Sequence, residues 1–174
     1  MISTILKAAT FVMFLLVFLP ILGINSAYSQ PNVVVQPAGI FATIDVSRAT
    51  NAIKILTSGN EDEKSVMLVE IESKPELFAP PVFYAASKVF AARKDLDKAI
   101  FWLYAGQLRA IYDARRCADT SARSAVSALN MQIDDSVRKY QLKIVDGLED
   151  LVRSVIAWDE KTPRQYDHRW INLH

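Results

Sequence analysis

The sequence predicts an all-α fold: a small helical bundle with an extended N-terminal lead-in and an irregular C-terminal tail. Two observations predict it. Apolar residues recur at helical spacing in successive segments between residues 47 and 158. Residues that favour helix starts, such as Asp95 and Asp119, stand directly before several of these segments. We therefore expect residues 47–174 to form one helical domain.

The first 29 residues have the pattern of a cleavable secretory signal peptide. A basic start with Lys7 leads into an apolar run of residues 8–24, and small residues follow. Ala27 and Ser29 occupy the third and first positions before the expected cut, which we place between Ser29 and Gln30. The pattern predicts an exported protein, periplasmic or secreted.

An uncleaved membrane anchor is the alternative interpretation of this run. About 17 to 25 apolar residues suffice to cross a bilayer, and the run is nearly that long. Pro20, late in the run, and the small-residue site favour cleavage. After cleavage, we expect no membrane association.

The remaining chain carries no excess of charge. Cleavage removes Lys7 and no acid, which leaves 19 basic and 19 acidic residues. Nucleic-acid binding normally needs a basic excess on one face, and polybasic membrane attachment needs runs of Lys or Arg. We expect neither activity. About 145 residues can form one domain whose core is stable without disulfide bonds. The single Cys117 cannot form a disulfide within the chain, and it is interpreted as a small buried residue.

The helices are expected to be separated by Pro, Gly and capping residues. Gly59 can end the first helix in a left-handed conformation, and Asn60 with Glu63 resembles a capping box. The run of residues 66–69 is equally compatible with a buried strand, and we choose helix. Pro81 suits the first position of the third helix. The expected helices cover residues 47–58, 61–74, 82–92, 96–116, 120–133 and 136–158.

The segments that flank these helices differ in their expected order. Residues 30–46 contain Pro31, Pro37 and Gly39 among β-branched residues, which predicts an extended lead-in with room for one short strand. The tail after residue 161 has no period, but it contains several large apolar residues. Such a tail is expected to fold back onto the helices.

The segment of residues 83–106 resembles a single tetratricopeptide or Sel1-type helix pair. Ser87 and Phe90 are followed by Ala99, Leu103 and Gly106 at the spacing of that family. No matching residues occur 34 positions before or after Ala99, so we expect one antiparallel helical hairpin and not an array. The resemblance implies protein binding on a groove of helices. An ordinary bundle that uses Ala and Gly at its central crossing is the alternative.

No catalytic or metal-binding pattern stands out. His168 and His174 are the only two histidines, and Cys117 has no histidine near it in sequence. Paired His or Cys ligands and calcium loops are absent from the sequence, and we expect no cofactor. The acidic groups at residues 61–63 and 134–135 stand where helices start, where they favour the helix dipole.

Two groups of residues are candidates for binding a partner, because aromatic residues and Arg dominate protein-binding hot spots. The first is aromatic and surrounds the hairpin, and the second is basic and lies toward the end of the long helix. Core packing and dipole pairing are the structural alternatives. The candidates are Phe78, Tyr84, Trp102, Arg109, Arg115 and Arg116.

The sequence therefore favours an exported protein-binding domain without enzymatic activity. Three alternatives remain: a periplasmic immunity protein that neutralises an exported toxin, an envelope-assembly accessory, and a hydrolase that uses carboxylates. The glycine in the long helix gives the sharpest structural expectation. Glycine inside a helix costs about 0.5 to 1 kcal/mol relative to Ala, so we expect Gly106 to mark a close contact within the hairpin.

Overall fold

Helices make up the regular structure of residues 37–173, the part of the chain that the computed structural model describes, and no strand occurs within this range. The predicted signal peptide and its cleavage site lie outside the described residues. The all-α fold is confirmed. No helix among residues 37–173 is both long enough and apolar enough to cross a membrane. The α-helices are α1 (Ser47–Ser58), α2 (Glu61–Ser73), α3 (Pro80–Ala92), α4 (Leu96–Arg116), α5 (Arg123–Met131), α6 (Asp135–Lys143) and α7 (Leu148–Lys161).

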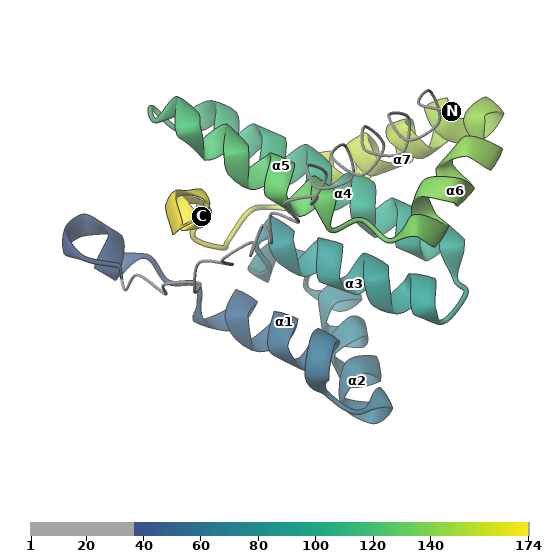
Figure 1. Ribbon diagram of the computed structural model, residues 1–174, viewed down its shortest axis with the longest axis horizontal. Coiled ribbons are helices and arrows are strands. Elements are labelled where there is room, and N and C mark those ends of the chain that lie inside the picture. The colour runs from purple at the N-terminus through teal and green to yellow at the C-terminus, as the bar shows by residue number, and fades with distance from the viewer. Residues whose placement is uncertain (1–36, 174) are drawn as a thin grey trace, which may run out of the picture. The chain divides into compact units, whose positions relative to one another are not determined.

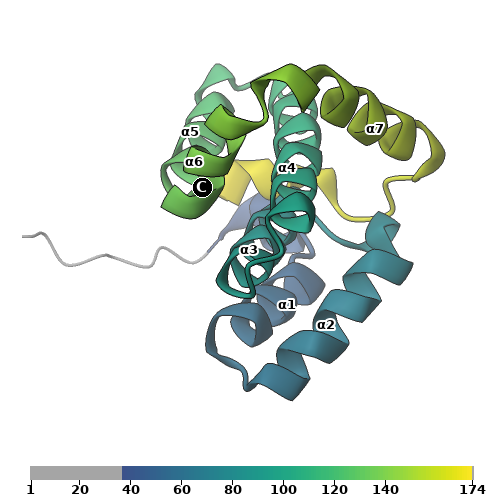
Figure 2. The ribbon, with the colours of Figure 1, turned by 90° about the vertical axis from the view of Figure 1, so that its right-hand side faces the viewer.

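The long helix α4 lies at the centre of the domain, as the two apolar faces of its sequence predict. It packs against α3, α5, α6, α7 and the C-terminal 3-10 helix His168–Leu173. Helix α3 contacts α1, which in turn contacts α2. Figures 1 and 2 show α1 and α2 on one side of the α3–α4 pair and α5, α6 and α7 around α4.

Helices α3 and α4 form the expected antiparallel hairpin, joined by a tight turn. Lys94 adopts a left-handed conformation with φ 65°, and the Asp95 amide donates to the Phe90 carbonyl at 3.0 Å. This arrangement closes α3 with a Schellman-type cap. Asp95 then caps α4, because its side chain accepts a hydrogen bond from the Lys98 amide at 3.2 Å.

The connection between α1 and α2 confirms one prediction and corrects another. Asn60 and Glu63 form a reciprocal capping box, with bonds of 2.8 and 2.9 Å. Residues 66–69 therefore belong to a helix and not to a strand. Gly59, however, has φ −70° and an extended conformation. The next helix is capped at the following residue, so the chain must extend at Gly59, where an added Cβ would meet the Ile55 carbonyl oxygen at 2.6 Å.

The prediction of one continuous helix over residues 136–158 was wrong. The chain forms α6, a 3-10 turn at Val145–Gly147, and then α7. Val137 and Val155 are buried, whereas Val145 is exposed. Both helices pack on α4, and the break between them allows the chain to redirect its apolar side chains toward that helix.

Two smaller boundary predictions also change. Helix α3 begins at Pro80, so Pro81 occupies its second position. The described part of the lead-in contains a 3-10 turn at Gly39–Thr43 in place of extended chain, and Gly39 takes a positive φ of 60° there. The predicted folding back of the tail is confirmed, because Tyr166, Trp170 and Ile171 are buried.

Small residues allow α3 and α4 to approach closely. Ser87 is buried and donates a hydrogen bond from Oγ to the Ala99 carbonyl at 2.6 Å. About two turns further along α4, Gly106 faces the side chains of Phe83 and Tyr84. A Cβ added at Gly106 would lie 2.9 Å from Tyr84 Cδ2 and 3.2 Å from Phe83 Cβ. The expected close contact at this glycine is therefore present.

Replacement of Gly106 by Leu is expected to lower the free energy of unfolding by about 1 to 3 kcal/mol, because the new side chain must displace the Tyr84 ring. A thermal melt of the variant measures the change. Gly147→Ala is the matched control, since an added Cβ there has nothing within 4 Å. An unchanged or raised midpoint for Gly106→Leu would contradict the prediction.

Candidate functional site

Two buried charged residues on α4 hold the C-terminal segment in place. Arg109 is 0% exposed, and Asp113, one turn later, is 3% exposed. The Arg109 Nε atom donates to Asp159 Oδ1 at 2.8 Å, and its Nη2 atom donates to the Thr162 carbonyl at 2.7 Å. Its guanidinium also lies 4.5 Å from the centre of the Trp158 ring. A buried charge needs such partners, so the end of α7 is fastened to the central helix.

Asp113 fastens the tail that follows. Its Oδ2 atom accepts hydrogen bonds from the Tyr166 hydroxyl at 3.0 Å and from Trp170 Nε1 at 2.8 Å. Burial raises the pKa of the Asp113 carboxyl, while the bonds from Trp170 and Tyr166 act in the opposite direction. Burial also raises the pKa of Tyr166, with the Asp113 charge adding to the effect. The tail therefore crosses α4 at a fixed position.

Asp167 joins this tail to the chain that enters α1. Its carboxylate accepts from Arg169, at 2.9 Å for Nε to Oδ1 and 2.6 Å for Nη2 to Oδ2. It also accepts from the Asp45 amide at 3.3 Å, and Arg169 donates to the Thr43 carbonyl at 3.1 Å. The hydrogen bonds from Arg169 lower the pKa of Asp167 to about 2. The carboxylate is thus ionised at neutral pH.

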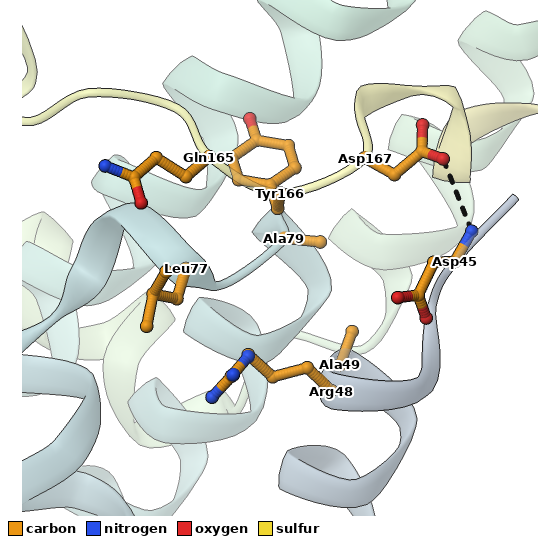
Figure 3. A pocket seen from close by; sticks show the side chains of 8 residues that line it. All are labelled: Asp45, Arg48, Ala49, Leu77, Ala79, Gln165, Tyr166 and Asp167. Atoms are coloured by element: carbon orange, nitrogen blue, oxygen red, sulfur yellow. Dashed lines mark hydrogen bonds between the residues drawn. The ribbon is translucent and has the colours of Figure 1, made fainter.

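A cavity of about 410 Å³ lies beside this junction (Figure 3). Asp45, Arg48 and Ala49 contribute to it from the start of α1. The segment before α3 contributes Leu77 and Ala79, and the tail contributes Gln165, Tyr166 and Asp167. In the view of Figure 3, the carboxylates of Asp45 and Asp167 lie on one side and the Arg48 guanidinium lies on the other. The cavity therefore combines separated charges with an apolar wall.

The aromatic candidates for partner binding belong to the core, which corrects the prediction that they face a partner. Phe78, Tyr84 and Trp102 are each at most 4% exposed. Trp102 packs against Phe83 with ring centres 5.1 Å apart, and the Tyr84 hydroxyl donates to Asn130 at 2.9 Å. Arg109 is likewise buried. These four side chains are inaccessible to a partner.

Arg115 and Arg116 are exposed, as a binding role requires. The Arg116 guanidinium lies 5.4 Å from the centre of the Tyr112 ring, and the Arg164 guanidinium lies 4.4 Å from the same ring. Tyr112 is itself 43% exposed. We name these four residues, Tyr112, Arg115, Arg116 and Arg164, the basic–aromatic patch. Within residues 37–173, neither Arg115 nor Arg116 forms an ion pair.

Sequence reasoning missed Asp113, Asp45 and Asp167 as structural or binding groups. Asp113 stands four residues after Arg109 on a helix that is apolar on two sides, and this spacing places both charges on one buried face. That spacing was an available signal. The position of Asp45 beside Asp167 joins residues 122 positions apart, and no local pattern predicts such a pairing.

The acidic groups at residues 61–63 and 134–135 lie at helix starts, and the cysteine is partly buried and hydrogen-bonded. Glu61, Asp62 and Glu63 form the first turn of α2, and Asp134 caps α6. The Cys117 thiol is partly buried and donates to Asn172 Oδ1 at 2.9 Å. Among the described residues, no group of three His, Cys, Asp or Glu side chains is placed to hold a metal ion.

Comparison of the chain with protein families, with curated proteins and with solved structures gives no match.

Loss of the buried guanidinium is expected to destabilise the fold. Arg109→Met should lower the free energy of unfolding by about 1 to 3 kcal/mol, because the Thr162 carbonyl loses its buried donor and Asp159 keeps only its ion pair with Arg164. Urea unfolding measures the change. Arg115→Met, on the exposed face of the same helix, is the control and should stay within about 0.5 kcal/mol of the unmodified chain. Equal stability of the two variants would contradict the buried role.

Asp167 is expected to stabilise the fold only where it is ionised. Its folded pKa of about 2 lies below the ordinary value of 3.8, so its contribution is present above pH 3.8 and is lost as pH falls toward 2. Asp167→Asn should therefore lower the unfolding free energy at pH 7 and have little effect near pH 2. Denaturant unfolding at both pH values tests this. A difference that persists unchanged at pH 2 would exclude the ion pair as its cause.

Proposed function

We propose that the protein is an exported, non-enzymatic protein-binding domain, and that its basic–aromatic patch binds an acidic surface of a protein partner. The observation that carries the proposal is the arrangement of Tyr112, an exposed aromatic side chain whose ring lies within 5.4 Å of the Arg116 guanidinium and 4.4 Å of the Arg164 guanidinium. Tyr and Arg are the residue types that supply most binding energy at protein interfaces.

The chemistry of the patch supports an acidic partner. Arg115 and Arg116 have no ion-pair partner among the described residues, so a partner's carboxylates can bind them without displacing an existing bond. Arginine binds carboxylates with two parallel hydrogen bonds, which gives direction as well as affinity. Stacking on Tyr112 holds the Arg116 side chain in place and reduces the entropy it loses on binding.

Apolar surface beside the charges supports a protein as the partner. Ile111 is 40% exposed and precedes Tyr112 on the same end of α4. On a helix, Ile111 and Arg115 share one face, and so do Tyr112 and Arg116, because residues four apart are neighbours. An interface of this kind suits acidic side chains that surround a single apolar one.

The double variant Arg115→Glu/Arg116→Glu tests the proposal. The probe is a fluorescent peptide with three Glu residues around one Leu, and its Gln counterpart measures binding that does not depend on charge. We expect the charge reversal to weaken binding of the acidic peptide about tenfold or more, and added salt to weaken it in the unmodified protein. Fluorescence anisotropy reports both effects.

Lys54→Glu/Lys139→Glu provides the matched control, since both lysines are exposed on other helices. This variant should bind the acidic peptide as the unmodified protein does. Equal binding of the Glu and Gln peptides would refute the proposal. Tighter binding of an RNA or DNA oligonucleotide than of the acidic peptide, at physiological salt, would assign the patch to nucleic acid instead.

A further inference from the structure

The cavity of Figure 3 has the size and composition of a small-molecule or side-chain binding site. Its volume of about 410 Å³ lies within the range of about 300 to 1,000 Å³ that is typical of ligand pockets. It is separate in composition from the basic–aromatic patch, with which it shares no residue.

Asp45 supplies an open carboxylate oxygen at this cavity. Its Oδ1 atom accepts from the Ser47 amide at 2.9 Å and from the Ser47 hydroxyl at 2.7 Å. Its Oδ2 atom forms no hydrogen bond with the described residues. The bonds from Ser47 lower the pKa of Asp45, so the group is ionised at neutral pH. The side chain is held in place by one oxygen and presents the other.

The other charges of the cavity are already paired. Asp167 forms an ion pair with Arg169, and Arg48 pairs with Glu70 at 3.2 Å. Among the described residues, Asp45 is the one carboxylate of the cavity without an ion pair. The charge of Asp167 acts to raise the pKa of Asp45, and the charge of Arg48 acts to lower it. Because Asp167 and Arg48 each have an ion-pair partner and Asp45 has none among the described residues, the cavity offers a cation one unpaired carboxylate.

An apolar wall lies beside this carboxylate. Ala49, Ala79 and the buried residue Tyr166 line the cavity from three segments of the chain. Leu77 extends the same wall. Long basic side chains bury an alkyl stem on apolar surface and keep the charge at a polar site. The cavity offers both parts of that arrangement.

We infer that this cavity binds an alkylammonium or alkylguanidinium group, the chemistry of a lysine or arginine side chain. The cation lies at Asp45, and the alkyl stem lies along Ala49, Ala79 and Tyr166. Either a free amine or a residue of a peptide can supply this group. A peptide differs from a free amine because its backbone can make additional contacts at the rim of the cavity, where the Gln165 side chain is exposed.

Binding of four probes to the full-length protein tests the inference. The probes are Nα-acetyl-arginine amide, its neutral isostere Nα-acetyl-citrulline amide, agmatine, and the peptide acetyl-Ala-Arg-Ala-amide. Titration calorimetry should show that the arginine compounds bind at millimolar concentration or below, and that the citrulline compound binds at least fivefold more weakly. Tighter binding of the peptide than of agmatine identifies a peptide source, and the reverse identifies a free amine.

Asp45→Asn removes the charge and retains an oxygen that can accept from Ser47. This variant is expected to weaken binding of the arginine compounds about two- to fivefold, the effect of one exposed ion pair. Asp62→Asn makes the same chemical change on the exposed face of α2 and should have no effect. Amide resonances of Asp45 and Tyr166 should shift on titration of the unmodified protein, a readout that requires no variant.

Three results would overturn the inference: no binding of any cationic probe at about 5 mM, equal binding of the arginine and citrulline compounds, or unchanged binding by Asp45→Asn. The variant Arg115→Glu/Arg116→Glu should retain binding of the cation. The two proposals can therefore fail separately. Binding of the acidic peptide is tested with Arg115→Glu/Arg116→Glu, and binding of the arginine compounds is tested with Asp45→Asn.

Discussion

The position of the C-terminal segment depends on the two charges buried in α4. An arginine that is 0% exposed cannot remain charged inside a protein without partners. The polar partners of Arg109, Asp159 and Thr162, come from the end of α7, and those of Asp113, Tyr166 and Trp170, come from the tail. Desolvation offsets much of the attraction in a buried ion pair. These bonds therefore fix where the segment lies more than they add to net stability.

Both proposed binding surfaces include residues of this segment. Arg164 forms an ion pair with Asp159 and lies over the Tyr112 ring, so the tail contributes one residue to the basic–aromatic patch. Asp167 accepts from the Asp45 amide and thereby sets one wall of the cavity in Figure 3. A change that released the tail would disturb the two surfaces together, whereas substitutions at Arg115 or Asp45 leave the buried bonds intact.

The sequence predicted the parts of the fold that depend on local rules. Asp95, Asn60 and Glu63 cap helices through bonds to residues three positions away, and the close approach at Gly106 follows from the cost of glycine in a helix. These effects can be read from short windows. The repeat type suggested for the α3–α4 hairpin remains a prediction.

The failures share a different cause, which is contact between distant segments. Arginine is a residue type that is frequent in binding hot spots, and Arg109 was therefore a candidate. Its burial depends on hydrogen-bond partners that stand 50 and 53 positions later in the sequence. The stripe of residues 136–158 has helical period throughout, but packing of α6 and α7 on the same central helix requires a turn between them. For the binding sites, Arg115 and Arg116 could be found from residue type, whereas Asp45 gains its role from a tail 122 positions away.

The packing around the hairpin also determines where binding can occur. A tetratricopeptide-like pair would bind partners along the exposed side of its helices, and a repeat array would leave such a side open. Here α1 and α2 lie on one side of α3 and α4, while α5, α6, α7 and the tail lie around α4 (Figures 1 and 2). Phe83, Tyr84 and Trp102 of the hairpin are consequently buried. The two surfaces proposed for binding lie instead at the end of α4 and beside the tail, where Arg115, Arg116 and Asp45 are exposed and have no ion pair among the described residues.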